Sequence, residues 1–197
     1  MAHKLFLNLE LLALKIVDEH IEKMTESNVL DSDCPECADK DAFENNLKNG
    51  WIAIVMLVNY VESTLNTILR DCVQCDDEKL MRLNFEEKIK IPYLYYRADM
   101  SGLKSDSSWE VFLKVNRIRN ELIHYKFNYI GTYGHIPVSL FGAVFTSIEF
   151  KKLRDGMLSF CKKIAKDFNL TINLDAQLFD SDGWGGPTSY IYDSRIT

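Results

Sequence analysis

Long apolar runs are missing from this sequence, and so is the layout of a secretory leader. The longest uninterrupted run, Trp51–Val58, is well short of the ~20 residues that a helix needs to cross a bilayer. Near the N-terminus the apolar residues are interrupted by Asn8, Glu10 and Lys15, and no small-residue cleavage site follows. We therefore expect a soluble, cytoplasmic protein with no membrane partner.

The chain also lacks an excess of positive charge, internal repeats and low-complexity tracts. Its formal net charge of −6 argues against indiscriminate binding of nucleic acids. The acids are concentrated between Asp18 and Glu44, where ten of them face two lysines, so the remaining chain carries +2. An anionic ligand is therefore compatible with a defined place on the rest of the protein. With 47% hydrophobic and 26% charged residues over 197 positions, the composition is that of one globular domain.

Apolar residues recur at helical spacing along most of the chain, which predicts an all-α fold. We expect long helices at residues 4–27, 51–70, 109–127 and 146–168, and a short one at 84–96. Pro92 is expected to break the short helix. Thr146 and Glu149 have capping-box spacing, which marks the start of the last helix.

Two segments between these helices are predicted to be irregular. Residues 28–45 form an acidic loop, and the glycine-containing residues 128–146 form a hairpin or irregular insertion before the last helix. The expected architecture is an antiparallel bundle of four to five helices that makes one domain of residues 1–170. The polar, glycine-rich residues 171–197 should follow it as a mobile tail or an edge element.

The helix expected at 109–127 has two different faces on a wheel of about 100° per residue. One face is apolar throughout and consists of Val111, Val115, Ile118, Leu122 and Tyr125. The opposite face mixes polar and apolar side chains, namely Asn116, Arg117, Asn120, His124, Leu113, Ile123 and Phe127. Such a face is too apolar for water and too polar for a core. We therefore expect it to lie against another helix or a second copy of the chain.

The polar groups of this second face suit a phosphate ligand. Asn120 and His124 are one helical turn apart, and Arg117 shares their face, while Arg119 lies at the flank and reaches it only through its long side chain. Arginine offers a rigid fork of donors, asparagine can orient a base or a water, and histidine titrates near neutral pH. From the spacing alone, a water-facing helix with a satisfied histidine is an equally good interpretation.

The stretch RNELIH, with Arg119, Asn120 and His124, resembles the motif of the HEPN superfamily, R-x(4–6)-H and often R-N-x-x-x-H. Arg117 and His124 also fit the longest spacing of that motif. The helix order is similar as well: a buried helix with a mid-helix acid (VNYVESTLNTIL), an amphipathic segment (EEKIKIPYL), the motif helix and a closing helix. The resemblance covers roughly residues 45–170.

What the resemblance implies is a metal-independent endoribonuclease that needs no cofactor for catalysis, or a non-catalytic HEPN-fold module that binds RNA or protein. Such domains often serve in toxin–antitoxin or anti-phage systems, with an antitoxin or sensor as partner, and commonly form homodimers whose motif helices face each other. His124 would act as general acid or base, Arg119 would stabilise phosphoryl charge, and Asn120 would orient the reacting groups. Further candidates for substrate contact or support of the site are Arg117, Asn116, Lys126 and Glu62, the last as a partner of Arg119 or His124.

Two points restrict this interpretation. HEPN toxins that are silenced by nucleotidyl transfer usually have a tyrosine two residues after the histidine, and Lys126 stands there instead. Lys126 would add positive charge beside the groove. In a third interpretation the protein is a structural helical adaptor, in which Arg119 and His124 are ordinary salt-bridge residues. Glu62 could equally be a helix acid that reaches only a backbone group or a water.

Four cysteines form two C-x-x-C pairs, Cys34 with Cys37 and Cys72 with Cys75. Their spacing is that of a four-cysteine structural zinc site, and free thiols are an equally good interpretation. Disulfides are disfavoured because a cytoplasm is reducing. A long helix between the pairs would hold them about 30 Å apart over twenty residues, which is unfavourable for a shared ion.

Overall fold

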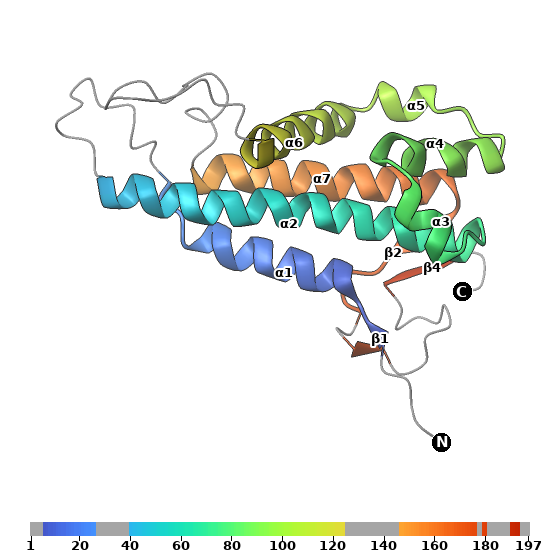
Figure 1. Ribbon diagram of the computed structural model, residues 1–197, viewed down its shortest axis with the longest axis horizontal. Helices are drawn as coiled ribbons and strands as arrows, with labels where there is room; N and C mark the ends of the chain where they lie inside the picture. The colour runs from blue at the N-terminus through green and yellow to red at the C-terminus, as the bar shows by residue number, and fades with distance from the viewer. Residues whose placement is uncertain (1–5, 27–39, 125–145, 177–178, 181–189, 194–197) are drawn as a thin grey trace.

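The computed structural model describes residues 6–26, 40–124, 146–176, 179–180 and 190–193 (Figure 1). Most of these residues are helical, which confirms the predicted all-α class. The helices are α1 (Leu9–Glu22), α2 (Lys40–Cys72), α3 (Asp77–Arg82), α4 (Phe85–Tyr95), α5 (Ser101–Lys104), α6 (Ser107–His124) and α7 (Ser147–Asp167). Four short strands accompany them: β1 (Phe6–Leu7), β2 (Leu170–Ile172), β3 (Phe179–Asp180) and β4 (Ile191–Asp193).

Helix α2 is the central element, and α1, α4, α6 and α7 all pack against it (Figure 1). It is apolar over most of its circumference, and its largest wholly buried side chains include Tyr60, Leu57 and Leu65. Its segment Glu44–Arg70 is long and apolar enough to cross a membrane by length and composition alone. However, 56% of its most apolar window is buried inside the protein, and the core helix of a soluble protein passes the same test.

Two helix boundaries differ from the prediction. Helix α2 begins at Lys40, so the last residues of the predicted loop at 28–45 are helical, while the loop proper lies outside the described residues. Helix α4 continues through Pro92 to Tyr95, so the predicted break at this proline is wrong. Proline removes one backbone donor, and here the helix needs only one further turn before it ends. Pro92 is also buried, so tertiary packing supports this last turn.

The start of α7 is as predicted from its capping residues. The Thr146 hydroxyl accepts a hydrogen bond from the backbone N–H of Glu149 at 3.2 Å. The backbone N–H of Ser147 donates to the Thr25 carbonyl at 2.9 Å, which joins the beginning of α7 to the end of α1. The predicted insertion at 128–146 lies outside the described residues except for Thr146.

Asparagines in the first part of α2 hold the end of α1. The Asn46 side chain accepts from the Thr25 backbone N–H at 2.9 Å and donates to the Thr25 hydroxyl at 2.7 Å. The Asn49 oxygen lies 2.7 Å from His20 Nδ1, so His20 is half-buried and bonded rather than a free surface residue. These bonds hold the polar first part of α2 against the end of α1, and Asn45 Nδ2 donates to the Lys23 carbonyl at 2.6 Å, which satisfies one of the carbonyls left unpaired at that helix end.

Part of the C-terminal segment is built into the helical core. Strand β2 pairs antiparallel with β4, and β1 pairs antiparallel with β3. Tyr190, immediately before β4, is buried, and its hydroxyl donates to the Tyr60 hydroxyl of α2 at 2.8 Å. Of the two alternatives for residues 171–197, the edge element therefore describes β2 and β4, and the remainder lies largely outside the described residues.

Candidate functional site

Helix α6 presents the predicted apolar face to the interior. Val115, Ile118 and Leu122 are buried, and Val111 is half-buried against the same core. Phe112 is buried too, although the helical wheel did not place it on this face, and it stacks on Phe160 of α7 with ring centroids 4.5 Å apart. The motif helix is therefore fixed by its inner face, which leaves the outer face available for a ligand.

The outer face of α6 carries the polar residues that the sequence analysis predicts as site residues. Arg117 and Asn120 are exposed, Asn116 and Arg119 are half-buried, and Leu113 remains 43% exposed. The face therefore combines cationic, amide and apolar groups, as predicted. The side chain of His124, the last residue of α6, and all of Lys126 lie outside the described residues.

Arg119 is joined to the outer face by its side chain. Its Nη1 donates a hydrogen bond to Asn120 Oδ1 at 3.0 Å. The backbone position of Arg119 is at the flank of the helix, so this bond directs the guanidinium toward the asparagine. His124 follows Asn120 by one helical turn, so the three motif positions form a continuous strip along α6.

Glu62 forms an ion pair with a lysine of α4. Its Oε1 lies 2.6 Å from Nζ of Lys88 on α4. The Lys88 side chain is only 5% exposed, whereas the Glu62 side chain is 41% exposed. Sequence reasoning did not anticipate this buried lysine, because its partner is 26 residues away on another helix. Glu62 neutralises Lys88, and its predicted link to Arg119 or His124 is untested.

A shallow apolar hollow lies on the first half of α2. Its volume is about 430 Å³, and it is lined by Glu44, Leu47, Lys48, Trp51 and Ile52. Helix α6 packs on both α7 and α2 and runs in the opposite direction to α2 (Figure 1). Trp51 is 38% exposed, which is unusual for so large an apolar side chain. The hollow of α2 and the outer face of α6 therefore both expose apolar side chains.

The length of α2 argues against one zinc ion held by both cysteine pairs of a single chain. Its 33 residues place its ends roughly 48 Å apart at 1.5 Å per residue. Cys34 and Cys37 lie outside the described residues, and the chain from Cys34 to Lys40 spans at most ~22 Å. Cys75 follows the helix by three residues, which adds at most ~11 Å. Cys75 and Cys161 are free thiols.

Within the described part of the chain, no three or more His, Cys, Asp or Glu residues are grouped closely enough to hold a metal ion. The predicted zinc site includes residues beyond that part, so it stays a prediction for metal analysis.

Comparison with known proteins adds no family assignment. No protein-family model, no curated protein and no solved structure matches the chain. The residues of α6 and their surroundings are therefore the basis for assigning a function.

Proposed function

We propose that this protein is a HEPN-type, metal-independent endoribonuclease whose four long helices form the bundle of that superfamily, and that it acts as a toxin or as an effector of anti-phage or stress responses. The observation that carries the proposal is the Arg119–Asn120 hydrogen bond of 3.0 Å on the outer face of α6, one turn before His124. The opposite face of the same helix is locked in the core.

The proposed reaction breaks a phosphodiester bond by transesterification. His124 removes the proton from a ribose 2′-OH, and the oxygen attacks the adjacent phosphorus. The bond from phosphorus to the 5′ oxygen breaks, and that oxygen takes up a proton. The products are a 2′,3′-cyclic phosphate and a 5′-hydroxyl.

Two motif residues support this chemistry. The Arg119 guanidinium stabilises the negative charge that grows on the non-bridging phosphoryl oxygens, because arginine stays charged and offers paired donors. Asn120 holds the Arg119 guanidinium from one side, which limits its rotamers and orients its remaining donors toward the substrate. Arg117 and Asn116 extend the same face toward neighbouring phosphates.

A second copy of the chain completes the cleft in this proposal. The outer face of α6 includes the exposed Leu113, and the hollow on the first half of α2 includes the exposed Trp51. Burying both against a partner removes apolar area from water, while the polar residues of two α6 helices line the space between them. This arrangement accounts for a face that is half polar and half apolar.

The test is cleavage of total cellular RNA by the purified protein in the presence of a metal chelator. We expect fragments with 2′,3′-cyclic phosphate ends, and we expect His124→Ala and Arg119→Ala to lose at least a hundredfold in rate. Arg82→Ala is the control for charge, because Arg82 is exposed and forms its ion pair with Glu78 of the same short helix, α3. Its rate should equal that of the wild type.

Expression in a bacterial host gives an independent readout of the proposed toxicity. Growth arrest by the wild type that His124→Ala relieves would support the proposal. Intact RNA in every assay, together with harmless expression, would overturn the catalytic claim and favour the non-catalytic binding module.

A further inference from the structure

We propose that the C-terminal end of α4, formed by Tyr95, Tyr96 and Arg97, is a stacking platform for the bases of single-stranded RNA. The inference rests on the proposed function in taking RNA as the ligand. It concerns a surface distinct from the motif, and none of these three residues belongs to the predicted site.

The platform exposes large apolar side chains to solvent. Tyr95 is 57% exposed and Tyr96 is 44% exposed, and Leu94 beside them is 75% exposed. These three consecutive residues form the most exposed group of large apolar side chains in the described structure. A contiguous group of this kind marks an interaction surface more often than single exposed residues do.

The two tyrosine rings are held in place by a chain of aromatic contacts. The ring centroids of Tyr95 and Tyr96 are 5.1 Å apart, with the ring planes at 83°. Tyr96 lies 5.1 Å from Phe168, which follows α7, and Tyr93 packs on the same phenylalanine at 4.9 Å. The rings are therefore positioned before any ligand arrives, which lowers the entropy cost of stacking a base on them.

Arg97 occupies a backbone position that favours glycine. Its φ is 51°, in the left-handed region, and it follows the last turn of α4. Its N–H donates to the Leu94 carbonyl at 3.2 Å, and the Ala98 N–H donates to the Tyr93 carbonyl at 2.9 Å. These two bonds define a Schellman motif, in which glycine usually takes the place of Arg97. An arginine at a backbone position that favours glycine indicates a function for the arginine side chain.

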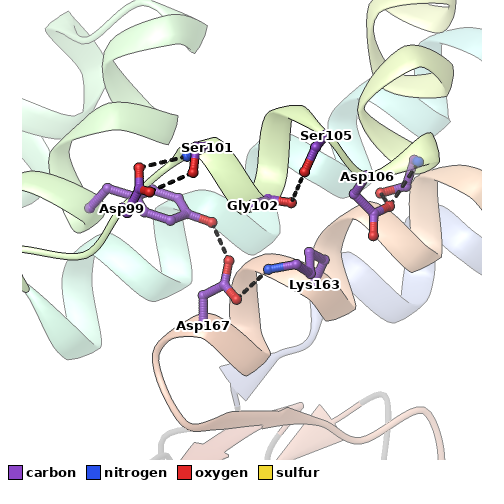
Figure 2. Close-up of polar contacts among 9 residues, drawn as sticks. Asp99, Ser101, Gly102, Ser105, Asp106, Lys163 and Asp167 are labelled. Atoms are coloured by element: carbon purple, nitrogen blue, oxygen red, sulfur yellow. Dashed lines mark hydrogen bonds and ion pairs between the residues drawn. The ribbon is translucent and has the colours of Figure 1, made fainter.

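Arg97 gives the platform a positive charge that can contact a phosphate. Arg97 is exposed and has no ion-pair partner in the described part of the chain. The nearby carboxylates are engaged: Asp99 accepts two hydrogen bonds from Ser101, and Asp167 is bound by Lys163 and by the Tyr93 hydroxyl at 2.7 Å (Figure 2). Between Phe85 and Lys104, Lys88 is buried against Glu62, and the other three basic residues balance the three acids, so this segment carries no net negative charge in a chain whose net charge is −6.

These observations favour RNA over an apolar protein partner. The ring of a tyrosine can stack on any base. An adjacent arginine can contact the phosphate or stack on a base as well. Single-stranded RNA is bound in this way because its bases are unstacked and accessible. Helices α5 and α6 begin at this end of the molecule (Figure 1). A single-stranded RNA bound to the platform can therefore follow α6 toward the motif.

The test measures binding of a short, unstructured, fluorescein-labelled RNA with 2′-O-methyl groups, which the proposed reaction cannot cleave. We expect Tyr95→Ala and Tyr95→Leu to weaken binding roughly 5- to 150-fold, the range for one lost base–aromatic stack. Tyr95→Phe keeps the ring and should bind like the wild type. Ile148→Ala removes a side chain of similar exposure, 46%, at the start of α7 and should have no effect.

Arg97→Gly separates binding from folding. It should raise the melting temperature by about 2–4 °C, because glycine relieves the left-handed backbone. It should also weaken RNA binding and lower the salt dependence of log K by about 0.7, the value for one phosphate contact on a single strand. A variant that is more stable and yet binds less RNA has lost a contact rather than its fold.

The outcomes distinguish this inference from the proposed function. Unchanged RNA binding by Tyr95→Ala and Arg97→Gly would overturn the platform, whether or not the wild type cleaves RNA. Full binding by Tyr95→Leu would also overturn it, because an apolar contact would then suffice. Weakened binding by both variants, in a protein that cleaves no RNA, would uphold the platform while the nuclease proposal fails.

Discussion

Gly156 of α7 lies directly against Val111 of α6, so close that a Cβ on the glycine would stand 2.6 Å from Val111 Cγ1. Real Cβ atoms essentially never approach a neighbour that closely. The absence of a side chain at this position therefore sets how near α6 can lie to α7. Because α6 carries the motif residues, Gly156 also helps to position the candidate site.

Gly156→Ala should destabilise the protein by about 1–2 kcal/mol. Overpacking costs about 1–3 kcal/mol, and the better helix propensity of alanine offsets up to ~1 kcal/mol of it. Chemical denaturation measures the change. Gly102→Ala is the matched control, since its Cβ would meet only Lys163 Nζ at 3.9 Å. The double variant Gly156→Ala with Val111→Ala should recover part of the loss, and no recovery would contradict the steric explanation.

Glu62→Gln should destabilise the protein by about 1–2 kcal/mol. It leaves the buried Lys88 ammonium without its carboxylate, and breaking a buried pair from one side is costly. The expected cost is below that of a fully buried pair because the Glu62 side chain is 41% exposed.

Lys88→Met tests the same pair from the other side. It removes the buried charge and keeps most of the volume, so the free energy of unfolding should change little. Adding Lys88→Met to Glu62→Gln should then restore stability. If Glu62→Gln instead abolishes RNA cleavage in a fully stable protein, Glu62 serves the site more than it serves Lys88.

The sequence predicts features that depend on residues close together in the chain, and it does not predict features that depend on contacts between distant segments. The inner face of α6 and the cap at Thr146 follow from spacing of three or four residues, and the structure confirms both. The early start of α2 and the passage of α4 through Pro92 could not be predicted in this way. The first depends on Asn46 and Asn49 binding the end of α1, and the second on the burial of Pro92.

The same distinction applies to the candidate site. The helical wheel places Asn120 on the outer face and Arg119 at its flank, within reach through its long side chain, and the hydrogen bond between them fits that placement. The partner of Glu62 could not be anticipated, because no sequence pattern shows which helix packs against its stripe. The exposed tyrosines at the end of α4 could not be predicted for a related reason. A run of tyrosines looks like core until the structure shows which rings are exposed.

The stability of the protein should fall as the pH rises above about 9. Burial raises the pKa of the Cys161 thiol to about 12, and it also raises the pKa values of Tyr60 and Tyr190, which lie in the same cluster. In the unfolded chain these groups ionise near their ordinary pKa values, so the unfolded state releases protons that the folded state retains. The stabilising contribution is therefore complete below about pH 9 and is lost as the pH rises toward 12.

Urea denaturation at neutral pH and at about pH 10.5 measures this loss in the free energy of unfolding. The variant Cys161→Ala shows how much of the loss comes from the Cys161 thiol. One group can contribute about 1–2 kcal/mol over this interval. The variant should be less stable at neutral pH because it leaves a cavity, but its stability should fall less steeply with pH. Identical slopes for the variant and the wild type would contradict the assignment to Cys161.

Trp51→Glu should convert the proposed dimer to a monomer and abolish cleavage while the motif residues are unchanged. A carboxylate in the hollow beside Leu47 and Ile52 would have to be buried without a partner when two chains associate, which costs several kcal/mol. Light scattering coupled to size-exclusion chromatography measures the mass. Leu174→Glu is the matched control, because Leu174 is equally exposed, 38%, just beyond β2. A wild type that is monomeric at every concentration and still cleaves RNA would remove the second chain from the mechanism.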